Sequence, residues 1–170
     1  MPRGSNIVLI GFMGTGKSEV GQRLASRLDR AFLDTDEQIV AKAGRSIPEI
    51  FELEGEVGFR DRETTLLGSL TDLQNAVLAT GGGILGRDEN VALLRGIGTL
   101  VCLSARPEVI LERTRPWNSR PLLAGSPDPR AMVERLLAER APRYALADVT
   151  IDTSERSIDE VVDELCRVFA

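Results

Sequence analysis

GFMGTGKS, residues 11–18, matches the phosphate-binding loop pattern G-x-x-x-x-G-K-[ST] at every required position. An apolar, β-prone run at residues 7–10 precedes it, and a helical pattern follows it. Such a loop works only at a strand-to-helix turn, so these flanks make a chance match far rarer. A glycine-rich turn that binds nothing is the alternative. The stretch predicts a nucleotide site, in a fold where a strand leads into a helix through this loop.

The residue types in the loop explain how it would hold phosphate. Gly11, Gly14 and Gly16 allow backbone conformations that other residues avoid, so N–H groups can come close to phosphate oxygens. The positive end of the helix that begins near Lys17 adds to this anion site. We expect Lys17 to reach the β- and γ-phosphates as a point charge, and Ser18 to supply a hydroxyl to Mg²⁺.

The composition predicts a single domain without nucleic-acid or membrane partners. The chain has 170 residues, a length typical of one domain. Its formal charge of −5 argues against a nucleic-acid or anionic-membrane surface, which would need a net basic face. We expect no signal peptide and no membrane span, because the early apolar run is short and flows into the phosphate loop. A cytoplasmic protein is therefore predicted, and its small size favours a monomer.

The absence of histidine narrows the possible chemistry. It removes Ser-His-Asp and Cys-His catalysis and any zinc site built on imidazole. Cys102 and Cys166 are isolated thiols in apolar surroundings, and we expect them to be buried and reduced.

Strand-like and helix-like segments alternate along the whole chain, which predicts an α/β fold with a largely parallel sheet. Strands are expected at residues 7–10, 31–34, 76–79, 99–103 and 149–151. Helices are expected at residues 18–28, 36–43, 46–53, 57–73, 88–94, 108–113, from 129 onward with a kink at Pro142, and 157–169. Residues 115–129 carry four prolines and are predicted to form a surface loop. In such sheets, ligands bind at the carboxyl ends of the strands.

Asp34 and Asp36 lie at the end of the second expected strand. Residues i and i+2 of an extended chain point the same way, so both carboxylates could face one cleft. In a phosphate-loop enzyme one acid at a strand end can hold Mg²⁺, and another can take the proton of the acceptor. An N-cap is the alternative explanation for Asp36, but it does not explain Asp34.

Two further patterns each allow two interpretations. Arg60 and Glu63 lie three residues apart on one expected helix, where a surface ion pair is the ordinary interpretation. The triple glycine at residues 81–83 follows a strand. It could form a plain tight turn, or its bare backbone could allow a ligand to approach closely.

The remaining candidates are arginines in the second half of the chain. Arg140 extends the apolar stripe of its helix, so it either has a partner or extends to solvent. Arg113, Arg115 and Arg120 cluster near the proline-rich loop, where a solvated charged loop is the ordinary interpretation. Trp117, in the same loop, could pack on a ligand or on the protein.

Several motifs occur together in order along the chain. They are residues 11–18, Asp34-Thr35-Asp36, Gly44-Arg45-Ser46-Ile47, Phe59-Arg60 with Glu63, Gly81-Gly82-Gly83, Arg120-Pro121-Leu122-Leu123, and Arg140-Ala141-Pro142 with Tyr144. The phosphate loop alone indicates only a nucleotide, whereas the combination is specific. With these motifs the chain resembles the shikimate kinase family from end to end.

The resemblance implies a nucleoside-monophosphate-kinase-like fold, a three-layer αβα arrangement with a five-stranded parallel sheet in one domain over residues 1–170. It further implies a substrate-binding subdomain near residues 35–63 and a lid near residues 115–128. The implied reaction transfers the γ-phosphoryl group of ATP to the 3-hydroxyl of shikimate, with Mg²⁺, in the pathway to chorismate and the aromatic amino acids.

The resemblance also implies a set of site residues. The nucleotide would be held by Gly14, Thr15, Gly16, Lys17, Ser18, Arg113 and Arg120, and the metal by Ser18 and Asp34. Shikimate would be held by Asp36, Arg60, Glu63, Gly82 and Arg140, with the two arginines on its carboxylate and Glu63 orienting Arg60. The implied catalytic residues are Lys17, Asp36 and Arg120. For Asp36, a role as base and a role in positioning the hydroxyl both stay open.

The chain departs from the family pattern at two places. Glu19 stands where the family usually has threonine, and its charge near bound phosphates would weaken nucleotide affinity slightly. The lid sequence RPWN at residues 115–118 is atypical.

Two rival functions are also possible. One is a related small-molecule kinase such as gluconate kinase, which would share the loop and fold. A GTPase-like switch is the other rival, and the lack of an N-K-x-D motif counts against it.

Overall fold

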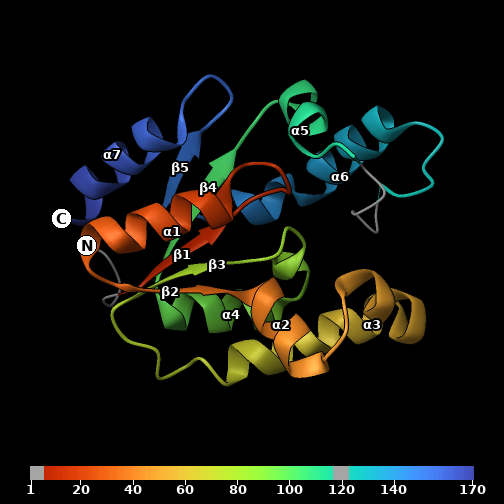
Figure 1. The fold of residues 1–170 in the computed structure, drawn as a ribbon, viewed down its shortest axis with the longest axis horizontal. Coiled ribbons are helices and arrows are strands. Elements are labelled where there is room, and N and C mark those ends of the chain that lie inside the picture. The colour runs from red at the N-terminus through yellow and green to blue at the C-terminus, as the bar shows by residue number, and fades with distance from the viewer. Residues whose placement is uncertain (1–5, 117–122) are drawn as a thin grey trace.

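A computed structural model describes residues 6–116 and 123–170, which form a parallel β-sheet flanked by helices (Figure 1). Within these residues the sheet has five strands in the order β2-β3-β1-β4-β5, and each neighbouring pair is parallel. The strands are β1 (Ile7–Ile10), β2 (Ala31–Asp34), β3 (Ala76–Ala79), β4 (Thr99–Ser104) and β5 (Val149–Asp152). β1, which leads into the phosphate loop, therefore lies at the centre of the sheet.

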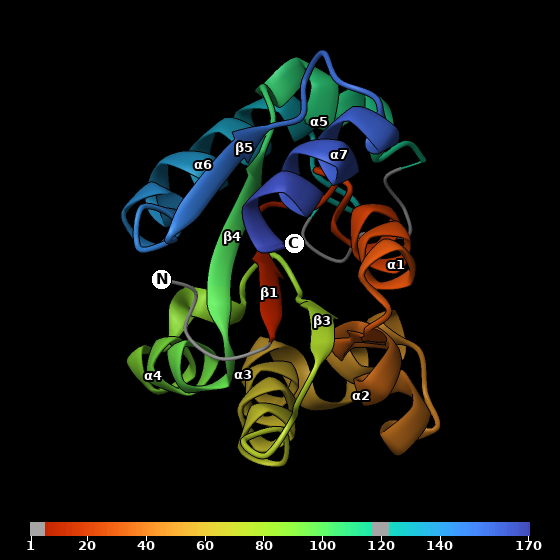
Figure 2. The ribbon, with the colours of Figure 1, turned by 90° about the vertical axis from the view of Figure 1, so that its left-hand side faces the viewer.

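Helices cover both faces of the sheet and make the fold three-layered. They are α1 (Lys17–Leu28), α2 (Thr35–Ala43), α3 (Ile47–Gly68), α4 (Asp88–Ile97), α5 (Pro107–Arg113), α6 (Pro129–Tyr144) and α7 (Ile158–Phe169), with a short 3₁₀ helix, η1 (Ile84–Gly86). Figure 2 shows α1 and α7 on one side of β1 and α4 on the other.

The central strand shows why the sheet carries helices on both faces. All four residues of β1 are fully buried, as expected for a parallel strand covered on both sides. Ile7 and Leu9 pack into the cluster formed with α1 and α7. Val8 and Ile10 point the other way and pack with residues of α3, α4 and η1. One continuous apolar run thus serves two hydrophobic cores.

A smaller apolar cluster joins α2 to α3, away from the sheet. Ile39 of α2 packs there with Ile50, Phe59 and Leu66 of α3. These two helices therefore have a core of their own.

The predicted fold is confirmed, with corrections to two helices. The predicted break at Gly55 is confirmed, because its φ of 70° and ψ of −179° are not helical and α3 consists of two helical segments that meet there at a kink. α3 ends at Gly68 rather than near residue 73, because residues 69–73 form turns in which Leu70 and Leu73 each bond to the carbonyl three residues back. α6 runs two residues beyond Pro142 before it ends.

Two helix starts follow the predicted capping boxes. At α3, Ser46 and Glu49 each bond to the other's backbone N–H, and Ser157 and Glu160 do the same at α7. These reciprocal bonds satisfy backbone donors that a helix start leaves unpaired.

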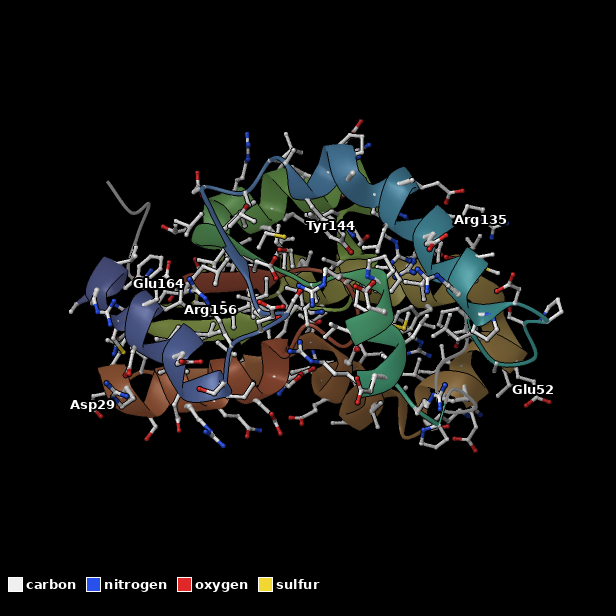
Figure 3. All side chains as sticks on the ribbon, turned by 90° about the horizontal axis from the view of Figure 1, so that it is seen from above. Asp29, Glu52, Arg135, Tyr144, Arg156 and Glu164 are labelled. Carbon is white, nitrogen blue, oxygen red and sulfur yellow. The ribbon has the colours of Figure 1, made fainter. Side chains whose placement is uncertain are left out.

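Figure 3 shows the side chains with the molecule seen from above. Asp29 and Glu52 lie at the periphery, whereas Tyr144 lies over the middle of the molecule. Among the residues described, no helix is both long enough and apolar enough to cross a membrane.

Candidate active site

The phosphate loop connects β1 to α1 in a conformation that glycine makes possible. Gly11 has φ +141°, and a Cβ there would lie 2.2 Å from the carbonyl oxygen of Leu103. Gly16, the N-cap of α1, is left-handed with φ 94° and ψ 17°. Both positions therefore exclude other residues on steric grounds. The loop leaves the first backbone N–H groups of α1 at the carboxyl end of the sheet, where an anion would meet them.

Lys17 is held against this loop rather than extended into solvent. Its Nζ donates hydrogen bonds of 2.7 Å to the carbonyl of Gly11 and 2.8 Å to that of Phe12. The side chain is buried and lines the cavity beside the loop. The ammonium group is thus already placed at the mouth of the anion site.

Ser18 and Asp34 meet next to the loop. Ser18 Oγ donates a hydrogen bond of 2.5 Å to Oδ2 of Asp34. A hydroxyl and a carboxylate oxygen are the hard ligands that Mg²⁺ accepts, and Mg²⁺ keeps water and phosphate oxygens for the rest of its shell. Among the described residues, no group of three or more Asp, Glu, Cys or His side chains is placed to hold a metal ion. The pair fits a magnesium ion that is shared with a nucleotide.

The cap of α2 corrects one part of the sequence argument. Asp34, not Asp36, is the N-cap, because its Oδ1 accepts hydrogen bonds from the N–H groups of Asp36 and Glu37. Asp36 lies in the first turn of the helix rather than in an extended chain. Both carboxylates nevertheless line the same cavity, so the two oxygens of Asp34 serve the helix and the cavity at once.

A cavity of about 610 Å³ extends along the phosphate loop. It is lined by Met13, Gly14, Gly16, Lys17, Ser18, Glu19, Asp34, Asp36, Thr80, Gly81, Gly82, Arg113, Arg156, Ser157 and Ile158. Thr15 is not among them, because its hydroxyl turns inward and donates to the carbonyl of Phe12 at 2.8 Å. Only the backbone of Thr15 could therefore contribute to phosphate binding.

Arg113 lies at the edge of this cavity and is fixed there by Thr153. Its guanidinium donates to the Thr153 hydroxyl at 3.0 Å and to the Thr153 carbonyl at 2.7 Å. It also reaches the carbonyl of Gly14 at 3.3 Å. Arg113 is thus an ordered cavity side chain, not part of a solvated loop.

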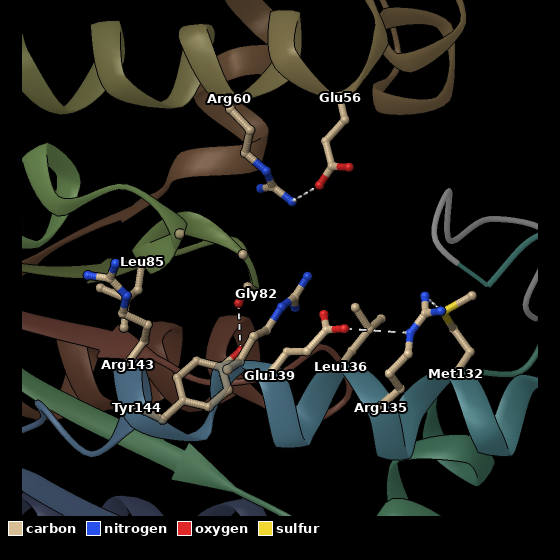
Figure 4. Close-up of a pocket in the computed structure, with 13 residues that line it drawn as sticks. Glu56, Arg60, Gly82, Leu85, Met132, Arg135, Leu136, Glu139, Arg143 and Tyr144 are labelled. Atoms are coloured by element: carbon tan, nitrogen blue, oxygen red, sulfur yellow. Dashed lines mark hydrogen bonds and ion pairs between the residues drawn. The ribbon is translucent and has the colours of Figure 1, made fainter.

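A second cavity of about 460 Å³ adjoins the first (Figure 4). Arg60 comes to it from α3, and Arg140 and Tyr144 come from α6, with Gly82 between the two helices. Gly82 also lines the first cavity, so the two spaces meet at this residue.

The Arg60–Glu63 pair is buried, which excludes the surface interpretation. The Glu63 side chain is fully buried and that of Arg60 is 14% exposed, and their hydrogen bond is 2.8 Å. Burial raises the pKa of the Glu63 carboxyl, Arg60 acts against that rise, and the nearby Asp36 adds to it. Burial also works against the charged form of Arg60, but the charges of Glu63 and Glu56 outweigh it and raise the Arg60 pKa.

The triple glycine at residues 81–83 is required because polar side chains lie close to its backbone. A Cβ on Gly81 would lie 2.9 Å from Glu63 Oε1 and 3.0 Å from Asp36 Oδ1, and one on Gly83 would lie 2.5 Å from Arg60 Nη2. A side chain at either position would collide with a candidate site residue. The loop is therefore more than a plain turn, because its bare backbone lets three polar side chains gather against it.

Arg140 does not extend to solvent. Its guanidinium lies over the ring of Phe12, with Cζ 5.2 Å from the ring centre. Its Nη1 is buried and has no hydrogen-bond partner within the described part of the chain. A buried guanidinium N–H without an acceptor is costly, so it marks a position where an anionic ligand would be favourable.

Two contacts at the site were not predicted from the sequence. Tyr144 donates a hydrogen bond of 2.6 Å to the carbonyl of Gly82, across 62 residues, and Thr153 anchors Arg113 across 40 residues. Only the position of Tyr144 inside a matched motif hinted at a role. Arg120 and Trp117, by contrast, lie outside the described residues, as does most of the N-terminal half of the expected lid.

Comparison with known proteins shows to which family the chain is similar. Residues 13–170 match the family model described as shikimate kinase. The chain is 46% identical over 164 residues to the shikimate kinase of Caldanaerobacter subterraneus subsp. tengcongensis, covering 96% of this chain and 95% of the relative. It is 51% identical over 149 residues to that of Neisseria meningitidis serogroup C, covering 87% of each.

A solved structure agrees with the sequence match. Shikimate kinase from Acinetobacter baumannii in complex with shikimate superposes with a TM-score of 0.92 at 42% identity, covering 96% of this chain and 91% of that chain. With the phosphate loop, the five-stranded sheet and these matches taken together, the chain is a member of the shikimate kinase family.

Proposed function

We propose that this protein transfers the γ-phosphoryl group of ATP to the 3-hydroxyl of shikimate, giving shikimate 3-phosphate and ADP, and that it requires Mg²⁺. The observation that carries the proposal is the meeting of two cavities at Gly82, one beside the phosphate loop and the other beside Arg60 and Arg140. A triphosphate in the first and a small acid in the second would meet end to end.

The loop cavity suits the nucleotide. Backbone N–H groups of Gly14, Thr15 and Gly16 would bind the phosphates, with Lys17 neutralising charge on the β- and γ-groups. Ser18 and Asp34 would hold Mg²⁺, which when bound neutralises further phosphate charge. Arg113 would lie against the base side of the nucleotide, and Arg120 is proposed to close over the phosphates.

The second cavity suits the carboxylate of shikimate. Two guanidinium groups can bind a planar carboxylate through paired, charge-assisted hydrogen bonds. Arg60 is fixed by its hydrogen bond to Glu63, and Arg140 offers a buried N–H without an acceptor among the described residues. Gly82 would contribute its backbone beside the ring.

Asp36 lies where the hydroxyl of the acid would meet the triphosphate. Its carboxylate shares the loop cavity with Lys17 and lies near Glu63, whose pKa it helps to raise. In the reaction the hydroxyl oxygen bonds to the γ-phosphorus, the bond from that phosphorus to the β-phosphate oxygen breaks, and the hydroxyl proton leaves. We propose that Asp36 orients the hydroxyl and receives this proton.

The surrounding parts of the chain take supporting roles in this proposal. The α2–α3 unit, with its separate core, would be the substrate-binding subdomain at residues 35–63. Residues 115–128 would form a lid that excludes water during transfer. We propose a monomer that acts in the cytoplasm. Unpaired thiols at Cys102 and Cys166 fit a reducing compartment.

A coupled assay of ADP release tests the proposal. Purified, folded protein should release ADP at a rate that depends on both shikimate and Mg²⁺, and the product should carry phosphate on the 3-oxygen. Gluconate serves as the control acceptor and should give no turnover above background. Folded protein that binds ATP but shows no shikimate-dependent release would refute the proposal, and turnover with gluconate instead would support the rival kinase.

A further inference from the structure

Tyr144 connects the two cavities through its hydroxyl group. The hydroxyl donates a hydrogen bond of 2.6 Å to the carbonyl oxygen of Gly82 (Figure 4). Tyr144 is the last residue of α6, one turn beyond Arg140, so the two side chains lie on the same face of the helix. Burial raises the pKa of Tyr144 to about 12, although the Arg140 guanidinium beside it acts in the opposite direction. The hydroxyl is therefore protonated, and able to donate, at neutral pH.

Gly82 itself is a point of close packing. A Cβ on it would lie 3.3 Å from Nη1 of Arg140 and 3.3 Å from the backbone nitrogen of Met13 in the phosphate loop. The same Cβ would lie 3.6 Å from the carbonyl oxygen of Gly11. The peptide at Gly82 thus lies between the loop that would hold the triphosphate and the arginine that would hold the acid.

We propose that the Tyr144 hydroxyl is a positioning group, which holds the Gly82 peptide against Arg140 and so sets where the acid lies relative to the phosphate loop. The hydrogen bond ties β3 and its glycine loop to the end of α6, two segments that lie 62 residues apart. The glycine loop has no side chains of its own. Its Gly81 N–H donates to Thr35 Oγ1 at 3.1 Å and its Gly81 carbonyl accepts from the Ile84 N–H at 3.2 Å, so these bonds fix Gly81, whereas the Tyr144 hydroxyl fixes Gly82. The inference rests on the proposed function, because it assigns a role in binding that acid.

The ring and the hydroxyl of Tyr144 have separable roles. The ring packs at the edges of two apolar clusters, one with α4 and the other with Phe12 and α6. Phenylalanine keeps these ring contacts and removes only the hydroxyl. Tyr144→Phe therefore tests the hydrogen bond, whereas Tyr144→Ala would also remove core packing.

The first measurement is a full kinetic comparison of the wild-type protein and Tyr144→Phe. A net hydrogen bond of ~1 kcal/mol corresponds to a change of about five- to tenfold, so we expect the KM for shikimate to rise by that factor. The KM for ATP should stay within about twofold, since the loop contacts of Lys17 and Ser18 are untouched. Ser69→Ala is the matched control. It removes another hydroxyl–carbonyl bond, to Leu66, at the far end of α3, and both KM values should stay unchanged.

The second measurement is a double-mutant cycle with Arg140. If the hydroxyl acts through Gly82 and Arg140, Tyr144→Phe should have less than about a twofold effect on shikimate binding once Arg140 is alanine. If the hydroxyl served only general stability, its removal would lower the affinity for shikimate equally with Arg140 present and with Arg140→Ala. Shikimate binding can be followed by calorimetry, independently of turnover.

The outcomes separate this inference from the proposed function. A wild-type protein without shikimate-dependent turnover or binding refutes the function, and the inference with it. A wild-type protein that binds shikimate, with a Tyr144→Phe variant that binds it equally well, refutes the inference alone. So does a variant in which the KM values for ATP and shikimate rise together, because that result would mean general loosening of the site.

Discussion

Ser18 Oγ donates a hydrogen bond to Asp34 Oδ2, while Asp34 Oδ1 accepts from the backbone of α2. One carboxylate thus joins the phosphate loop, the end of β2 and the start of the next helix. Substitutions at Asp34 can separate a metal-binding role from a capping role, because asparagine caps helices about as well as aspartate but lacks the charge.

Asp34→Asn should weaken magnesium-dependent nucleotide binding without loss of stability. We expect the Mg²⁺ concentration that half-saturates ATP binding to rise by about tenfold or more, since a charged ligand oxygen is replaced by an amide. The melting temperature without ligand should change little. Titrating Mg²⁺ against a fluorescent ATP analogue, alongside a thermal melt, measures both quantities.

The companion variant Asp34→Ala removes the cap as well. Loss of an N-cap costs about 1 kcal/mol, which lowers the melting temperature of a domain this size by about 2–4 °C. A similar loss of stability in Asp34→Asn, with no change in the Mg²⁺ requirement, would mean that Asp34 is only a cap.

Arg60→Ala and Arg140→Ala should each weaken shikimate binding far more than ATP binding. Truncating one partner of a buried, charge-assisted contact costs ~2 kcal/mol or more, so the dissociation constant for shikimate should rise by at least about thirtyfold. Calorimetry with each ligand separately gives the comparison. Arg62→Ala is the control on the same helix, because Arg62 pairs with Glu54 outside both cavities.

The two arginine variants should differ in stability. Arg60→Ala leaves the buried Glu63 carboxylate without its guanidinium, which costs ~3 kcal/mol when the carboxylate stays charged. The described residues hold no ion pair to Arg140, so Arg140→Ala should leave the free energy of unfolding much less affected. Equal loss of both ligands in either variant would mean that the arginine is structural.

Glu63 gives a prediction for pH. Burial raises the pKa of its carboxyl in the folded state. At a pH between the ordinary pKa and this raised pKa, the folded state therefore binds a proton that the unfolded state releases. That contribution to stability is present below the ordinary pKa of about 4.5 and is lost as pH rises through the folded value. Glu63→Gln cannot titrate. The unfolding free energy of the wild type relative to Glu63→Gln should therefore fall as the pH rises above about 4.5, as urea titrations of both proteins would measure. A difference that stays constant or grows with pH would contradict the raised pKa.

Local sequence signals were sufficient for the sheet, the phosphate loop and the capping boxes. Residues 7–18 predicted strand, loop and helix because each depends on neighbours along the chain. The S-x-x-E spacing at Ser46 and Ser157 predicted helix starts for the same reason. For Asp34 and Asp36 the shared cavity was predicted correctly from the wrong geometry, since Asp36 is helical rather than extended.

Burial of the arginine pair could not be predicted from its spacing. Arg60 and Glu63 have the i, i+3 separation of any surface pair, and the glycine loop at residues 81–83 that covers them comes from a distant part of the sequence. The Tyr144–Gly82 bond is equally non-local. Such contacts depend on how α3, β3 and α6 pack together, which no single window of sequence contains.

Glu19 provides a test of nucleotide affinity. It lies in the first turn of α1, is exposed and lines the loop cavity, where its charge would face bound phosphates. An acid in a first turn favours the helix dipole by ~0.5 kcal/mol, but the same charge repels an anion at the same helix end. Glu19→Gln should therefore tighten binding of both ATP and ADP by about two- to fivefold at low salt, and by less at high salt as charges are screened.

Glu52→Gln, at the periphery of the molecule, is the control for a lost carboxylate and should leave both affinities unchanged. Affinities that do not depend on residue 19 would place its carboxylate outside the field of the bound phosphates.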